Sequence, residues 1–289
     1  MNDPKLTTIT RKSFLQQAML LTGRLVGLGA LTGLYGYGWE RKWIEVTRTP
    51  IVVPGMPKPF HGMKLAHFSD LHLGHYCEPE DVQRVVDLIM QEKPDMICFT
   101  GDLVDESTRL VAAAVPILRQ LQAPLGKFAV LGNHDYRTFE QQVVREAWSS
   151  AGFEVLDNRH VRLERQGSRL YVAGVDDVLV GEPDLRRAVS GIPSEETVIL
   201  LVHEPDFADE AAAYPIRLQL SGHSHGGQVR IPLIGAVLTP KLSQKYVQGL
   251  YQTAGKAMQV YTTRGVGTTI LPPHLLHDAG REREQAAAF

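Results

Sequence analysis

The stretch MKLAHFSDLHLG (residues 63–74) joins a short apolar run to a polar cluster that contains Asp70 and His72. The apolar runs 96–99 and 128–131 end in polar clusters in the same way. Short apolar runs bounded by glycine and polar residues are typical of buried strands. Because ligands of open α/β sheets collect at the carboxyl ends of strands, these junctions predict both the fold and the place of the site.

Helical periodicity alternates with the apolar runs along the rest of the chain. In residues 80–92, Val82, Val85 and Ile89 recur at the spacing of one helix face. Further helices are expected at 110–121, 139–150 and 206–213. Strands are expected at 63–68, 96–99, 128–131, 154–156, 161–164, 170–175, 198–202, 218–220, 228–231, 247–251 and 258–262. This alternation predicts an α/β fold with a largely parallel core.

The composition is that of an ordinary globular protein, with 44% hydrophobic and 21% charged residues among 289. The formal net charge of −2 lacks the basic excess of a nucleic-acid binder, so no nucleic-acid partner is expected. The two cysteines, Cys77 and Cys98, form no CxxC pair, which argues against a zinc module built on thiolates. A disulfide between them is the less favoured interpretation.

The N-terminus has the pattern of an export signal. A basic segment, 5–12, precedes the apolar stretch 18–39, and TRKSFLQ (10–16) resembles a twin-arginine signal with Lys12 in place of the second arginine. This predicts that the protein is attached to the cell membrane or exported across it. The cytoplasmic face of the membrane is the alternative location. No A-x-A cleavage site follows, which favours a stretch that stays in place as an anchor. Cleavage of the stretch is the alternative. The alternative is an amphipathic helix packed on a cytosolic domain.

Five polar clusters follow predicted strands. They are Asp70-Leu71-His72, Gly101-Asp102, Gly132-Asn133-His134-Asp135, His203 and Gly222-His223-Ser224-His225. Oxygen and nitrogen donors of these types suit Mn, Fe, Zn or Co. Residues two apart in an extended segment project to the same side, so Asp70 and His72 are expected to reach one ion, and likewise His223 and His225. Two divalent ions about 3.5–4 Å apart can clamp a phosphoryl group.

In order and spacing these clusters resemble the signature of the calcineurin-like metallophosphoesterases, D-x-H, G-D, G-N-H-D, H and G-H-x-H, over residues 64–267. The resemblance implies two packed mixed β-sheets flanked by helices, a four-layer sandwich with the metal site at one edge. It divides the chain into a signal or anchor with its linker (1–50), a metallophosphoesterase domain (51–272) and a C-terminal tail (273–289). The tail has no strand pattern, so it is either disordered or lacks the family's last strand.

The resemblance also implies a role for each site residue, around two divalent ions. The first ion would be held by Asp70, His72 and His225, the second by Asn133, His203 and His223, and both by Asp102. His134 would face the phosphate and protonate the leaving oxygen, and Asp135 would orient the His134 ring.

A few further residues remain open. Asp105 is either a helix cap or an acceptor behind the site. Arg264, beside the segment 265–267, either approaches a phosphate or belongs to a plain turn. His75 is expected to be solvated rather than in contact with substrate. No metal role is expected for His61, His67, His160, His274 and His277.

The segments SDLHLG, TGDLVD, GNHD, HEPD and GHSHGGQ resemble the bacterial exported subfamily, which includes phosphodiesterases and UDP-2,3-diacylglucosamine pyrophosphatases. This implies in-line attack of a metal-bound hydroxide on a phosphodiester or pyrophosphate of a lipid or envelope component. The alternatives are a phosphomonoesterase with the same metal core, a nuclease, or a catalytically silent, metal-stabilised binding protein. The sequence gives no indication of the oligomeric state.

Overall fold

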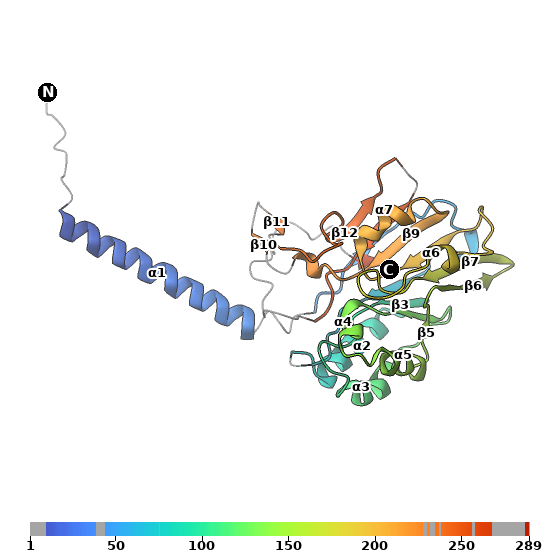
Figure 1. Cartoon of the computed structure of the whole chain (residues 1–289), viewed down its shortest axis with the longest axis horizontal. Coiled ribbons are helices and arrows are strands. Elements are labelled where there is room, and N and C mark those ends of the chain that lie inside the picture. Colours follow the sequence, from blue (N-terminus) through green and yellow to red (C-terminus); the bar gives the residue numbers. More distant parts are fainter. Residues whose placement is uncertain are drawn as a thin grey trace, which may run out of the picture.

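The computed structural model describes residues 10–38, 44–74, 76–227, 230–231, 235–236, 238–255, 258–267 and 287–288. Helix α1 (Arg11–Gly38) is drawn apart from the rest of the chain in Figure 1. Its stretch Arg11–Leu31 is long and apolar enough to cross a membrane, and none of that stretch is buried. Met19, for example, is 73% exposed. The helix therefore does not pack on the domain in the way that the cytosolic alternative required.

The first sheet consists of four parallel strands in the order β2-β3-β4-β5. Their bounds are β2 (Leu65–Phe68), β3 (Met96–Thr100), β4 (Lys127–Val130) and β5 (Glu154–Val155). Helices α2 (Pro79–Gln91), α3 (Val111–Leu118) and α5 (Gln141–Ser150) connect them. Helix α2 begins at Pro79, a residue that suits the first helical position, and the Asp81 carboxylate accepts the backbone N–H of Glu78 at 3.0 Å.

The second sheet has six strands in the order β12-β13-β9-β8-β7-β6. Their bounds are β6 (Arg159–Arg165), β7 (Ser168–Gly174), β8 (Val198–Leu201), β9 (Ile216–Ser221), β12 (Gly249–Gln252) and β13 (Gln259–Thr262). The outer pairs, β6 with β7 and β12 with β13, are antiparallel, and the three pairs between them are parallel. This sheet is therefore mixed, whereas the first is parallel throughout.

The two sheets pack face to face, with helices on both outer sides (Figure 1). Alternation along each strand sends one set of side chains between the sheets, including Cys98, Phe128 and Ile199. The other set meets the helices: Phe68 packs with residues of α2 and α5, and Leu200 packs with residues of α6 (Leu185–Ala188) and α7 (Ala208–Ala211). The predicted four-layer α/β architecture is confirmed.

Some details differ from the sequence prediction. The expected helix 206–213 is split into η3 (Pro205–Phe207) and α7. The short helix α4 (Asn133–Arg137) was not predicted. Both cysteines are buried and free, so the disulfide is not formed.

Several short elements lie outside the two sheets. They are η2 (Lys58–Phe60), η4 (His225–Gly227) and the two-residue strands β10 (Arg230–Ile231) and β11 (Gly235–Ala236). The expected tail 273–289 falls outside the described residues except for β14 (Ala287–Ala288), which pairs in parallel with β1 (Arg48–Thr49). His75, His274 and His277 also lie outside them.

Candidate metal centre

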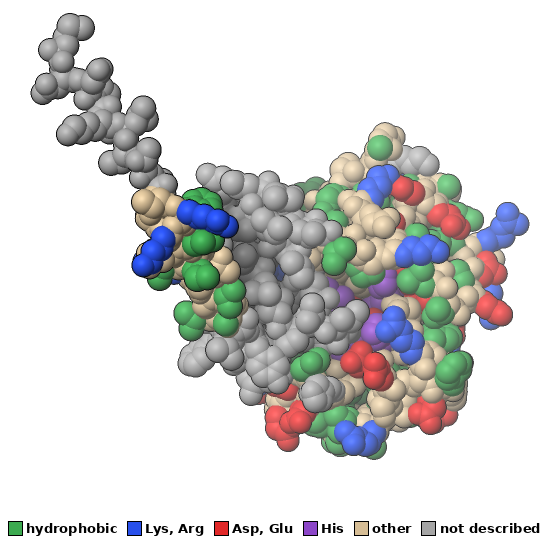
Figure 2. All heavy atoms as spheres, turned by 60° about the vertical axis from the view of Figure 1, so that its left-hand side comes forward, with side chains coloured by type: hydrophobic (Ala, Val, Ile, Leu, Met, Phe, Trp, Pro, Cys, Tyr) green, Lys and Arg blue, Asp and Glu red, His purple; other side chains and the backbone are tan. Residues whose placement is uncertain are grey.

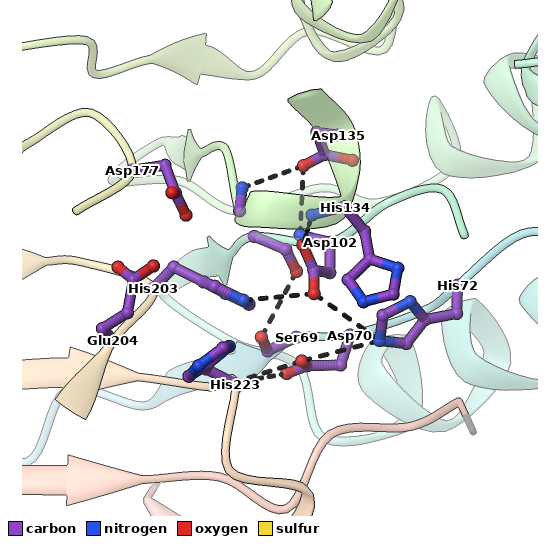
Figure 3. A network of polar contacts seen from close by, with 12 residues as sticks. Ser69, Asp70, His72, Asp102, His134, Asp135, Asp177, His203, Glu204 and His223 are labelled. Atoms are coloured by element: carbon purple, nitrogen blue, oxygen red, sulfur yellow. Dashed lines mark hydrogen bonds and ion pairs between the residues drawn. The ribbon is translucent and has the colours of Figure 1, made fainter. Parts of the chain in front are cut away.

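Six of the seven predicted ligands, all but Asn133, have ligand atoms that come together at one end of the two sheets, just after the strands end. Figure 3 shows part of this group. Strands β2, β3 and β4 lead to Asp70 and His72, to Asp102 and to Asn133, and strands β8 and β9 lead to His203 and to His223 and His225. All seven side chains are buried. The carboxyl ends of strands in both sheets thus build a single site, as the sequence predicted.

The first group of donors consists of Asp70, His72 and His225, whose ligand atoms all lie within 4.8 Å of one another. Oδ1 of Asp70 is 3.7 Å from Nε2 of His72 and 3.5 Å from Nε2 of His225. The two ring nitrogens are 3.2 Å apart. Three donors converging on one point are the arrangement that a divalent ion requires.

The second group consists of Asp102, His203 and His223, again within 4.8 Å. Oδ2 of Asp102 lies 3.1 Å from Nε2 of His203 and 3.6 Å from Nε2 of His72, so a single carboxylate oxygen reaches both groups. Its other oxygen accepts the backbone N–H of His134 at 2.8 Å. Asp102 therefore occupies the position from which a carboxylate can bridge two ions.

Backbone carbonyls fix two of the imidazole rings. Nδ1 of His203 lies 2.7 Å from the carbonyl of Thr100, and Nε2 of His223 lies 2.9 Å from that of Lys241. With an ion bound, each ring would keep its proton on the nitrogen that faces the carbonyl and would coordinate through the other nitrogen. This is the usual support of a metal-binding histidine.

Two buried ligand atoms support the fit of these residues to metal ions. Oδ1 of Asn133 and Nε2 of His203 have no hydrogen-bond partner among the described residues. Buried polar atoms are nearly always satisfied, and an unsatisfied one costs about 1–3 kcal/mol. Bound cations would satisfy both atoms, and a set of nitrogen and oxygen donors suits the predicted Mn, Fe, Zn or Co.

The backbone at the ligands corrects one step of the sequence argument. Five of the seven ligands have positive φ: Asp70 (55°), His72 (49°), Asp102 (61°), His223 (66°) and His225 (49°). The prediction that Asp70 and His72 lie in an extended segment is therefore wrong, and so is the one for His223 and His225. Their side chains converge because left-handed turns follow the strands, and such residues cost about 1–3 kcal/mol each. Strain of this size is expected where a site dictates the backbone.

Glycine at 222 is what allows two of these turns to meet. A Cβ on Gly222 would lie 1.9 Å from Oγ of Ser69 and 2.4 Å from Oδ2 of Asp70. The absent side chain lets the His223 segment approach the Asp70 segment, whose carboxylate accepts the His223 N–H.

His134 lies beside the centre, with its ring edge-on to that of His72 at 4.6 Å between centroids. Its Nδ1 is 3.1 Å from Oδ1 of Asp105, so Asp105 is the acceptor behind the site. Helix α3, which begins after Leu110, is not capped by Asp105. A charge-assisted contact of this kind fixes the ring and leaves Nε2 as the nitrogen that can meet a substrate.

The expectation that Asp135 orients His134 is wrong. The Asp135 carboxylate instead accepts four backbone N–H groups, those of Asp102, Leu103, Val104 and Gly132 (Figure 3). It thus holds the Asp102 turn against the start of α4. The family resemblance implied a pairing that the helical turn prevents, because neighbouring residues on a helix do not face each other.

Burial and charge set the ionisation of the centre. Burial lowers the pKa of His223 and of His225 to about 4, so both rings are neutral at pH 7 and offer an unprotonated nitrogen. Burial alone would raise the pKa of Asp102, but the charge of the nearby His203 holds it well below its ordinary value. Burial opposes protonation of His134, yet the Asp105 hydrogen bond and the Asp102 charge raise its pKa. The site thus places ionised carboxylates beside an imidazole whose pKa they raise.

Sequence reasoning missed an outer layer of acids. Asp177 and Glu204 lie beside His203 in Figure 3, and burial raises the pKa of both carboxyls. Next to them, Asp176 accepts the hydroxyl of Tyr136 on α4. The pair 176–177 follows β7 directly, so the rule that located the other clusters could have found it.

Comparisons with known proteins agree with this geometry. Residues 63–227, more than half of the chain, match the model of the family described as calcineurin-like phosphoesterase. The metallophosphoesterase YkuE of Bacillus subtilis is 40% identical over 255 residues, covering 86% of this chain and 88% of that protein. Phosphodiesterase YaeI of Escherichia coli is 30% identical over 268 residues, covering 90% and 93%.

Of two further matches, one is a longer protein and the other is a solved structure of lower sequence identity. A zebrafish (Danio rerio) transmembrane protein with a metallophosphoesterase domain is 32% identical over 255 residues, and the match covers 84% of this chain but 57% of that protein. The solved structure of TT1561 from Thermus thermophilus has a TM-score of 0.47 and 15% identity, covering 71% of this chain and 90% of that one. With the family model and the bacterial relatives matched over most of its length, the chain belongs to the calcineurin-like phosphoesterase family and is a metal-dependent phosphoesterase.

Proposed function

We propose that this protein hydrolyses a phosphodiester or pyrophosphate bond of a lipid or envelope component, using two divalent ions. The observation that carries the proposal is Oδ2 of Asp102, which lies within reach of both histidine groups. A phosphodiesterase name on one relative and the resemblance to UDP-2,3-diacylglucosamine pyrophosphatases support the diester or pyrophosphate as substrate.

The proposed division of labour follows the geometry. Asp70, His72 and His225 would hold one ion, Asn133, His203 and His223 would hold the other, and Asp102 would contribute to both. When bound, such ions polarise the phosphoryl group and lower the pKa of bound water towards about 7.

His134 is the proposed general acid. Burial opposes protonation of the ring, but the Asp105 hydrogen bond raises its pKa and holds Nδ1, which leaves Nε2 to donate to the leaving oxygen. Asp135 keeps the Asp102 turn in place through its four backbone contacts. The proposal needs no nucleophile from the chain and no covalent intermediate.

The proposal places the enzyme at a membrane. Residues 1–50 would be a twin-arginine-like signal or anchor with its linker, and 51–272 the catalytic domain. The exposed apolar helix α1 and the transmembrane name of a relative support this, and the cytoplasmic face remains open.

The decisive experiment compares bis-p-nitrophenyl phosphate with p-nitrophenyl phosphate as substrates of the Mn²⁺-loaded full-length protein. Asp102→Asn is expected to lose metal and activity together. His134→Ala is expected to keep its metal and lose about 10²–10⁴-fold in kcat.

His160→Ala is the matched control. The His160 ring bonds the carbonyl of Ala188 at 2.7 Å, away from the centre, so activity should stay unchanged. Preference for p-nitrophenyl phosphate would favour a phosphomonoesterase. Metal binding without turnover of either substrate would favour the silent binding protein.

A further inference from the structure

The segment that follows β13 runs along the loop of the first metal group. The N–H of Val266 donates to the carbonyl of Ser69 at 3.0 Å, and that of Gly267 donates to the carbonyl of Asp70 at 2.6 Å. A Cβ on Gly265 would lie 2.7 Å from Cβ of Asp70. Residue 264 is therefore fixed next to a metal ligand.

The side chain of Arg264 continues along this rim. A Cβ on Gly226 would lie 2.9 Å from Cγ and 3.2 Å from Cδ of Arg264, and Gly226 directly follows His225. The aliphatic part of the arginine thus lies against Gly226, the residue next to His225, while the backbone of the following residue, Gly265, lies against Asp70. Figure 2 shows histidine side chains reaching the surface beside basic side chains.

The guanidinium of Arg264 contacts a carboxylate from the linker. Its Nη2 lies 2.6 Å from Oε2 of Glu45, and the two side chains are 23% and 53% exposed. Exposed ion pairs of this kind are weak and exchange readily. A guanidinium fork fits phosphate as well as carboxylate, so the carboxylate can be replaced by a phosphoryl group.

We propose that Arg264 binds a phosphoryl oxygen of the substrate at the first metal group, and that Glu45 occupies its guanidinium when no substrate is present. The inference rests on the proposed function. It adds a residue for substrate affinity and links the site to the segment that follows α1.

The test measures binding of inorganic phosphate to the Mn²⁺-loaded full-length protein by calorimetry, with bound metal counted in every sample. Arg264→Gln should weaken phosphate binding about tenfold or more, because a charge-assisted bond is lost. Arg264→Lys should recover part of the affinity. Glu45→Gln should strengthen binding about threefold, since a weak competitor is removed.

The matched controls are Arg159→Gln and Glu154→Gln. These residues form an exposed arginine–carboxylate pair, with 2.8 Å between Nη1 of Arg159 and Oε1 of Glu154. The pair lies away from the metal centre, so phosphate affinity should stay at the parental value. Unchanged affinity in Arg264→Gln, or loss of metal from it, would overturn the role in substrate binding. Unchanged affinity in Glu45→Gln would overturn the competition. Because binding is read without turnover, failure of the parent to hydrolyse either nitrophenyl substrate would count against the proposed function alone.

Discussion

At the residue scale, the sequence predicted which Asp and His side chains gather after the strands, but it did not predict their local geometry. The order of Asp, Asn and His clusters after strands brought together the residues that converge in the structure. The left-handed backbone at Asp70 and His223 has no sequence signal, since nothing but the site imposes it. The partner of His134 was likewise missed, because the contact joins helix α4 to the loop of Asp105, 29 residues earlier in the chain.

His67 is a partly buried histidine that the centre does not use. It lies three residues before Asp70, and its Nε2 is 2.8 Å from Oγ1 of Thr100. Burial lowers its pKa to about 3 from 6.5. Between pH 3 and pH 6.5 the His67 ring is protonated in the unfolded chain and neutral in the folded chain. The folded state therefore loses stability as pH falls from about 6.5 towards 3.

The His67→Gln variant should remove this sensitivity. The loss of unfolding free energy between pH 7 and pH 5 should be about 2 kcal/mol smaller than in the parent, from 1.5 pH units at 1.36 kcal/mol each. Urea unfolding of both metal-free proteins at the two pH values measures it. Because the site histidines titrate in both proteins, equal losses would show that His67 does not carry the effect.

At the element scale, strands and long helices were predictable because their hydrophobic periodicity extends over many residues. Helix α4 was not, since five residues are too few for a period to appear. Yet α4 carries both Asn133 and His134. It is tied to the second sheet by Tyr136, whose hydroxyl donates to Asp176 and accepts from Arg145 at 2.9 Å.

Tyr136→Phe should release this tie without touching the centre. We expect a loss of about 1 kcal/mol in stability from the hydrogen bond. We also expect weaker Mn²⁺ binding, because Asn133 begins the same helix. Metal titration and thermal unfolding measure the two effects.

Tyr246→Phe is the matched control, because the Tyr246 hydroxyl donates to Asp209 at 2.9 Å and Lys245 lies beside that pair. It should cost similar stability and leave metal binding intact. Equal metal affinity in both variants would show that Tyr136 stabilises the fold without supporting the metal site.

At the scale of the whole molecule, the centre joins the two sheets. Four ligands follow strands of the first sheet and three follow strands of the second, so bound cations cross-link the layers. Ions that bind only the folded chain stabilise it by about 4 kcal/mol at a thousand times their Kd. For a domain of this size, EDTA should therefore lower the Tm on the order of 10 °C. Calorimetry checks this, and Mn²⁺ added back should restore the Tm. An unchanged Tm after verified metal loss would show that the sheets do not depend on the ions.

Membrane attachment should depend on helix α1, whereas catalysis should depend on the domain alone. None of the stretch Arg11–Leu31 is buried, so a chain that starts at Ile44 should fold, stay in the soluble fraction and hydrolyse bis-p-nitrophenyl phosphate at the parental rate. The full-length variant Leu20→Arg/Leu21→Arg should also leave the membrane, because each arginine near the middle of a span costs about 2.5–3.5 kcal/mol. Val52→Arg, a charge at an exposed site outside α1, should remain in the membrane fraction. Fractionation of cells with an activity assay on each fraction decides between the outcomes. If the shortened chain still sediments with membranes, the attachment lies in the domain; if it is soluble and inactive, the helix supports the fold as well.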